Sequence, residues 1–199
     1  DVIAYLKLAL NPFDDIALNR VINTPARGLG KTTLDEVAAR AREFGTSMWE
    51  AIAILTDEKS SQPRNLTPRA LDALKRFKAI VSGLTEKVSE ASTGERPVTD
   101  VVVASIEDTG YANMLRDENS DEAVARLENL EELVNAAVDY DQQEENGLRD
   151  FIDHAALSSD TDKYEKNAAV TMMTVHAAKG LEFPVVVLGN IDKRNLRPQ

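Results

Sequence analysis

The sequence predicts a mainly α-helical chain that ends in a short strand–turn–strand piece. Up to about residue 165, apolar residues recur at steps of three and four between helix-start signals, which is the pattern of amphipathic helices. Beyond residue 166 this pattern gives way to two short runs rich in β-branched residues, 170–175 and 184–188. Residues 166–199 are too few to build an α/β domain of their own. We therefore expect the two strands to belong to a larger sheet.

Most predicted helices begin at capping signals. The signals are Asp14 or Asp15, Thr33 with Glu36, Ser47 with Glu50, and Thr67 followed by Pro68. Three apolar faces follow: Ile16, Leu18, Val21 and Ile22; then Leu71, Leu74, Phe77, Val81, Leu84 and Val88; then Val124, Leu127, Leu130, Val134 and Val138. A last helix is expected over 148–157, and the polar segment 158–167 is expected to be a linker. The predicted boundary between the two parts is 165/166.

Composition excludes several classes of protein. Apolar residues make up 43% of the chain, enough for a sizeable core, and the absence of cysteine excludes disulfides and thiolate sites. With only two histidines, a histidine-rich metal site is not expected. No apolar stretch reaches the roughly 20 residues that span a bilayer, and no signal-peptide pattern is present. We expect a soluble, cytoplasmic protein without membrane partners.

The net charge of −11 is concentrated in one block. Residues 1–99 carry 14 basic and 13 acidic side chains, whereas residues 100–165 carry 4 basic and 19 acidic ones, and residues 166–199 carry 5 and 2. The acidic block has the composition of a solvated helical surface. Both flanking segments remain free to meet an anion such as a nucleic-acid phosphate.

A glycine turn, Arg27-Gly28-Leu29-Gly30-Lys31-Thr32, precedes one predicted helix. Its end resembles a nucleotide-binding P-loop, but Pro25 stands where that loop needs a glycine, and a helical pattern precedes it where a strand is needed. The turn also suits a DNA backbone phosphate, because backbone N–H groups at a helix N-terminus lie beside two basic side chains. A plain turn between helices remains the third possibility.

A second cluster of chemically versatile residues lies between the two expected strands. The segment from Val170 to Pro184 presents His176 and Lys179, which can donate to phosphates, and Glu182, which can accept from a sugar hydroxyl. Ligands of open α/β sheets bind at the carboxyl ends of strands, where this turn is expected.

The stretch Thr-Val-His-Ala-Ala-Lys-Gly-Leu-Glu-Phe-Pro at 174–184 resembles motif V of the UvrD/PcrA/Rep group of superfamily 1 DNA helicases. Other segments are similar, in order, to the start and middle of that family's 2B subdomain: 1–6, 11–12, 14–15, 20–23, 25–30, 109–111 and 126–133. The resemblance implies a multi-helix 2B-like subdomain over residues 1–165. Residues 166–199 would then be a β-turn-β fragment of the α/β, RecA-like motor domain 2A.

The resemblance also implies a function. Family members couple ATP hydrolysis to 3′-to-5′ translocation and unwinding, and the chain would be the part that contacts duplex DNA and regulates the motor. DNA contacts would fall on Arg27, Gly28, Leu29, Gly30, Lys31, Thr32 and His176; nucleotide contacts would fall on Lys179, Gly180 and Glu182. The parent would use ATP and Mg²⁺. Its partners would be single- and double-stranded DNA, helicase domains 1A, 1B and the rest of 2A, and DNA-repair proteins.

The resemblance stops at Gly189, and no counterpart of Walker A, Walker B or a γ-phosphate-sensing arginine is found in the 199 residues. The chain alone is therefore expected to hold no catalytic residue, bound cofactor or metal, and to be inactive as an ATPase. Two alternatives remain. One is a helical protein–protein interaction module without DNA or nucleotide binding, and the other is an independent NTPase that uses Gly30-Lys31-Thr32.

Overall fold

The computed structural model describes residues 1–59, 65–143, 147–161 and 185–187, and in these it contains nine α-helices and no strand. The chain divides into two compact units, Asp1–Leu157 and Ser158–Gln199. The helices are α1 Val2–Leu10, α2 Asp15–Val21, α3 Lys31–Phe44, α4 Met48–Thr56, α5 Pro68–Ser92, α6 Val98–Glu107, α7 Tyr111–Glu118, α8 Asp121–Gln142 and α9 Leu148–Thr161. The predicted mainly α fold is confirmed for the described residues.

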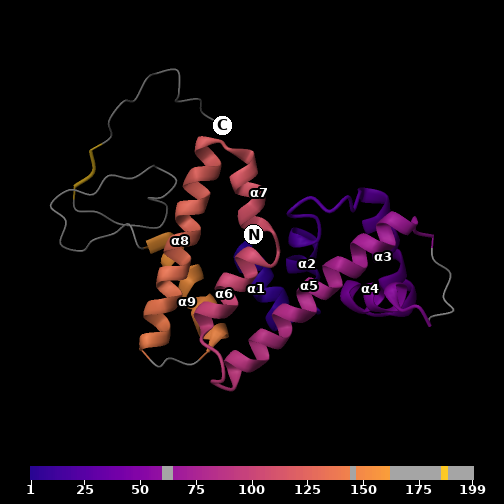
Figure 1. Ribbon diagram of the computed structural model, residues 1–199, viewed down its shortest axis with the longest axis horizontal. Helices are drawn as coiled ribbons and strands as arrows, with labels where there is room; N and C mark the ends of the chain where they lie inside the picture. Colours follow the sequence, from indigo (N-terminus) through magenta and orange to yellow (C-terminus); the bar gives the residue numbers. More distant parts are fainter. Residues whose placement is uncertain (60–64, 144–146, 162–184, 188–199) are drawn as a thin grey trace. The chain divides into compact units, whose positions relative to one another are not determined.

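Helices α1 and α5 form the centre of the first unit. Helix α1 packs against α2, α5 and α6, and buries Tyr5, Leu6 and Leu8 completely. The long helix α5 packs against α1, α4 and α6, so it links α4 to the α6 side of the unit (Figure 1). Its predicted apolar face is confirmed from Leu74 to Val88, with each predicted residue in that span at most 6% exposed. The interior of the unit is thus built on α1 and on the apolar face that the sequence predicts for α5.

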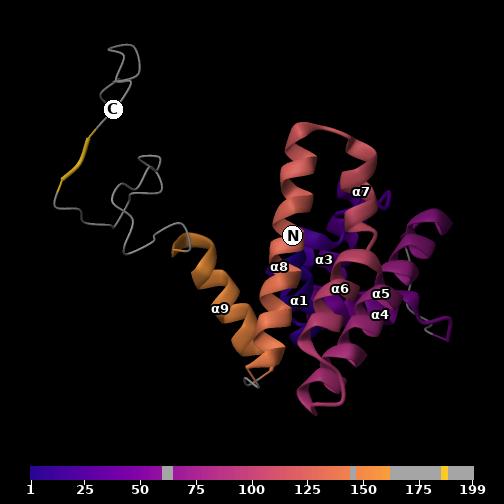
Figure 2. The same ribbon diagram turned by 60° about the vertical axis from the view of Figure 1, so that its left-hand side comes forward.

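Helix α8 packs against α6 and α7, and Figure 2 shows α7 and α8 running side by side. Its predicted apolar face is only partly confirmed. Alanines near both ends, Ala123 and Ala137, are buried, whereas Val124 and Val138 are 50% and 38% exposed. Small residues allow close helix packing at these two points, while the larger side chains between them are left half-buried along a groove.

Three of the predicted helix starts are confirmed by hydrogen bonds. The Asp14 carboxylate accepts from the N–H groups of Ile16 and Ala17, and the hydroxyls of Ser47 and Thr67 accept from the third residue of α4 and α5. Ile16 itself, predicted to face inward, is 85% exposed, because Ala17, Leu18 and Val21 form the buried face of α2.

The capping box predicted at Thr33 and Glu36 is wrong. Helix α3 begins three residues earlier than this box predicts, at Lys31, because Gly30 has the extended backbone of an N-cap residue, with φ −73° and ψ 170°. The Glu36 carboxylate instead forms an ion pair with Arg40 at 3.0 Å. The start of α3 therefore has no side-chain cap.

Helix α6 is capped by a residue 43 positions away in the sequence. The Asp141 carboxylate of α8 accepts from the backbone N–H groups of Val98 and Thr99, at 2.8 and 2.9 Å, and from the Thr99 hydroxyl. We expect Asp141→Ala to lower the free energy of unfolding by about 2 kcal/mol, because it leaves these donors unpaired. Urea denaturation measures this, and Asp139→Ala, at an exposed position of the same helix, is the control. Equal effects from both substitutions would contradict the capping role.

The C-terminal expectations are only partly tested. Helix α9 extends to Thr161, so the start of the segment predicted as a linker is helical. The boundary predicted at 165/166 and the strand predicted at 170–175 lie outside the described residues. Val185–Val187, in the second predicted strand, form no strand and are 63–87% exposed. The predicted β-turn-β fragment is thus not confirmed. None of the described helices is long and apolar enough to cross a membrane.

Candidate nucleic-acid interface

The glycine turn between α2 and α3 has a fixed shape. Gly28 lies in the left-handed region, with φ +73°, which glycine adopts at little cost. The Asn23 side-chain oxygen accepts from the backbone N–H groups of Arg27 at 2.8 Å and Leu29 at 3.4 Å. Leu29 is 1% exposed and packs in the core, so its side chain fixes the turn to the hydrophobic interior. Leu29 therefore contributes the position of the turn and presents no side chain to a ligand.

The end of the turn is an open helix N-terminus. The Gly30 carbonyl accepts from the N–H groups of Thr33 and Leu34, which leaves the N–H groups of Lys31 and Thr32 without an acceptor among the described residues. Both side chains are exposed, and Lys31 makes no ion pair with any described residue. Free N–H groups at the positive end of a helix dipole attract anions, and a neighbouring ammonium group adds to that attraction.

Arg27 is held inside the fold. Its guanidinium donates to the carbonyl oxygens of Val21, Pro25 and Thr109, at 3.2, 2.9 and 2.9 Å. The guanidinium carbon also lies 5.9 Å from the ring centroid of Tyr5 and 5.6 Å from that of Phe77. These contacts use three of the five N–H groups of the guanidinium. They fix the glycine turn to α1, α5 and the turn before α7.

Tyr5 and Tyr111 complete this arrangement. The Tyr5 hydroxyl donates to the carbonyl oxygens of Val21 and Thr24, and the Tyr111 hydroxyl donates to the Asp1 carboxylate at 3.0 Å. Burial raises the pKa of Tyr5, and the nearby Arg27 opposes that shift. The Tyr5 hydroxyl is therefore protonated at neutral pH and available as a donor. Segments whose sequences resemble the helicase family thus meet in space around Arg27.

One basic residue at this turn was missed by the sequence reasoning. Arg69 is the second residue of α5 and is exposed. An ideal Cβ on Gly28 would lie 3.7 Å from its Nη2 atom and 3.8 Å from its Nε atom, so its guanidinium lies against the turn. The signal in the sequence that could have identified Arg69 is its place in the first turn of a predicted helix, because the helix dipole disfavours positive charge there.

The structure brings six of the predicted site residues together, from Arg27 to Thr32. The other four, His176, Lys179, Gly180 and Glu182, lie outside the described residues. The glycine turn does not fit a nucleotide in the manner of a P-loop, because the helix α2 precedes it and not a strand. In the described part of the chain, no group of three or more His, Cys, Asp or Glu residues is placed to hold a metal ion.

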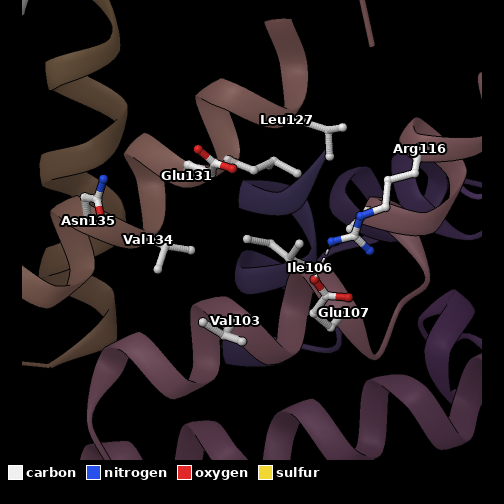
Figure 3. A pocket seen from close by; sticks show the side chains of 10 residues that line it. Val103, Ile106, Glu107, Arg116, Leu127, Glu131, Val134 and Asn135 are labelled. Carbon is white, nitrogen blue, oxygen red and sulfur yellow. Dashed lines mark hydrogen bonds and ion pairs between the residues drawn. The ribbon is translucent and has the colours of Figure 1, made fainter. Parts of the chain in front are cut away.

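A separate groove of about 340 Å³ lies between α6, α7 and α8 (Figure 3). Its apolar lining includes Val103 and Ile106 of α6 and Leu127, Leu130 and Val134 of α8. Two acidic residues, Glu107 and Glu131, also line it, and Glu107 pairs with Arg116 at 3.1 Å. An apolar groove with carboxylates at its edge is suited to an apolar segment that carries basic side chains.

Comparison with known proteins identifies relatives over almost the whole chain. Residues 1–198 match the family model described as UvrD-like helicase C-terminal domain. The chain is 34% identical over 201 residues to the ATP-dependent DNA helicase PcrA of Bacillus subtilis, and 36% identical over 198 residues to DNA helicase II of Escherichia coli. Each alignment covers 97% of this chain and 26% of the relative. A probable DNA helicase II homolog of Rickettsia conorii is 34% identical, with 94% of this chain and 27% of the relative covered.

Proposed function

The chain belongs to the family of UvrD-like helicase C-terminal domains, and from that premise we propose that it grips duplex DNA for an ATP-dependent helicase. It spans about a quarter of the length of the relatives it matches, so the activity proposed is that of the whole protein. The grip is the glycine turn with the N-terminus of α3, and its target is a backbone phosphate. Such a contact fixes the position of the duplex and reads no base sequence.

The open N-terminus of α3 is the observation that carries this proposal. Its first two N–H groups and the Lys31 ammonium group are suited to bind an anion. Residues 23–34 contain no carboxylate that could compete with a phosphate for these donors. The turn is held by Asn23 and Arg27 before any ligand arrives. A preformed site costs little ordering entropy on binding, which suits a contact that a moving helicase makes and breaks repeatedly.

We expect Lys31→Gln to weaken binding to a duplex with a 3′ single-stranded tail and to make that binding less sensitive to salt. Each lost phosphate contact lowers the slope of log affinity against log salt by about 0.9. Fluorescence anisotropy across a salt series measures both quantities. Lys87→Gln is the control, because Lys87 already pairs with Asp108 at 2.6 Å and lies about 28 Å along α5 from its start.

Two results would count against the grip. Absence of duplex binding by the unchanged chain at low salt would remove the proposal for this region. An unchanged salt slope in Lys31→Gln, with binding intact, would show that the duplex is held elsewhere on the chain.

The motor chemistry belongs to the parent. There hydrolysis of ATP, with Mg²⁺ as the cofactor, would supply the free energy for translocation, and the motif V-like segment is proposed to connect the single strand and the nucleotide. His176 would face the single strand, and Lys179, Gly180 and Glu182 would contact the nucleotide. The partners proposed for the chain are single- and double-stranded DNA and the other helicase domains.

The groove beside α8 favours a second candidate function, a protein–protein contact. Its apolar floor is half-buried, and α8 carries seven acidic residues and one basic residue. The occupant that fits is an amphipathic helix with basic flanks. If this were the function of the chain, such a peptide would bind it, Leu130→Glu would abolish that binding, and duplex DNA would not bind.

A further inference from the structure

We propose that Arg69 is a second phosphate-binding residue of the glycine turn and holds the DNA backbone on the α5 side of it. This inference rests on the proposed duplex grip and adds a residue that lies 41 positions beyond Gly28 in the sequence. It makes the site a pair of cations contributed by two helices, Lys31 from α3 and Arg69 from α5.

The position of Arg69 is set by the start of α5. The Thr67 hydroxyl caps the helix by accepting from the Ala70 N–H group at 3.2 Å, and Pro68 occupies the first turn. Arg69 follows directly, and its guanidinium lies within van der Waals reach of a Cβ built on Gly28. These distances are ordinary van der Waals contacts, so the Arg69 guanidinium lies directly beside the turn.

The charge of Arg69 is not compensated. It makes no hydrogen bond or ion pair with any described residue, whereas Arg76, two turns further along α5, pairs with Asp72 at 2.8 Å. Neither residues 23–34 nor residues 65–71 contain a carboxylate. An unpaired cation in the first turn of a helix is disfavoured by the helix dipole. This arrangement becomes favourable when an anion binds between the cation and the helix N-terminus.

A guanidinium is well suited to this ligand. Its planar fork donates two parallel hydrogen bonds to a phosphate, and it loses less hydration than an ammonium group. Lys31 and the free N–H groups of α3 would hold one phosphate, and Arg69 would hold a phosphate on the other side of Gly28. Because both contacts are to the backbone, the loss of either should weaken binding to all duplex sequences equally.

The test compares four variants of the 199-residue chain, Lys31→Gln, Arg69→Gln, Arg69→Lys and Arg76→Gln, by anisotropy with the labelled, 3′-tailed duplex across a salt series. We expect Arg69→Gln to lower affinity about ten-fold and to reduce the salt slope by about 0.9. Arg69→Lys should keep the slope and lose only part of the affinity. Arg76→Gln is the matched control on the same helix and should behave as the unchanged chain. Thermal unfolding of each variant confirms that it folds.

The outcomes separate the inference from the proposed function. If Lys31→Gln weakens binding and Arg69→Gln matches Arg76→Gln, the grip stands and the role of Arg69 is wrong. If Arg69→Gln loses affinity with an unchanged slope, Arg69 acts through the fold and the inference is again wrong. If the unchanged chain does not bind the duplex at low salt, both proposals fail.

Discussion

Replacing Arg27 with methionine is expected to lower the free energy of unfolding by about 3 kcal/mol. The substitution keeps most of the apolar stem but leaves three carbonyl oxygens, those of Val21, Pro25 and Thr109, without their donor. It also removes the cation that lies over the rings of Tyr5 and Phe77. Urea denaturation followed by circular dichroism measures the loss.

Arg20→Met is the matched control for Arg27→Met. The Arg20 side chain is 64% exposed and pairs with Asp1 at the surface, so its loss should change stability by less than about 1 kcal/mol. Duplex affinity should fall in Arg27→Met because the turn loosens, while the salt slope should stay the same. A reduced slope in a variant of unchanged stability would show instead that Arg27 contacts phosphate directly.

Arg27 also shows where sequence reasoning reached its limit. A basic residue beside two glycines before a helix predicts an anion site, and the turn is present as predicted. Periodicity cannot show that the guanidinium turns inward, because its acceptor on Thr109 is 82 positions away. The same applies to Arg69 and Asp141, whose roles depend on which helices pack together.

Local signals were more reliable where the physics is local. Caps at Asp14, Ser47 and Thr67 depend on hydrogen bonds that span two or three residues, and all three are confirmed. The Thr33–Glu36 box failed because Gly30, in an extended conformation, already ended the turn, and Thr33 therefore fell inside the helix. The prediction of the apolar face of α8 was wrong at its two ends, Val124 and Val138, because neighbouring helices cover only part of that face.

Leu29 allows the shape of the turn to be tested apart from its charge. We expect Leu29→Ala to lower the free energy of unfolding by about 2–4 kcal/mol, because the side chain is 1% exposed in the core and the substitution leaves a cavity. Leu29→Ile keeps the volume and should cost less than about 1.5 kcal/mol. Thermal or urea unfolding of the two variants measures the difference.

The same two variants show what the anchor contributes to the proposed grip. If the turn must be held in place for its N–H groups to meet a phosphate, Leu29→Ala should weaken duplex binding at a temperature where the variant is still folded. Its salt slope should match that of the unchanged chain, because no charge has been removed. Leu29→Ile should bind normally. Unchanged binding by a folded Leu29→Ala would mean that Lys31 and Arg69 hold the duplex by charge alone, whatever the geometry of the backbone between them.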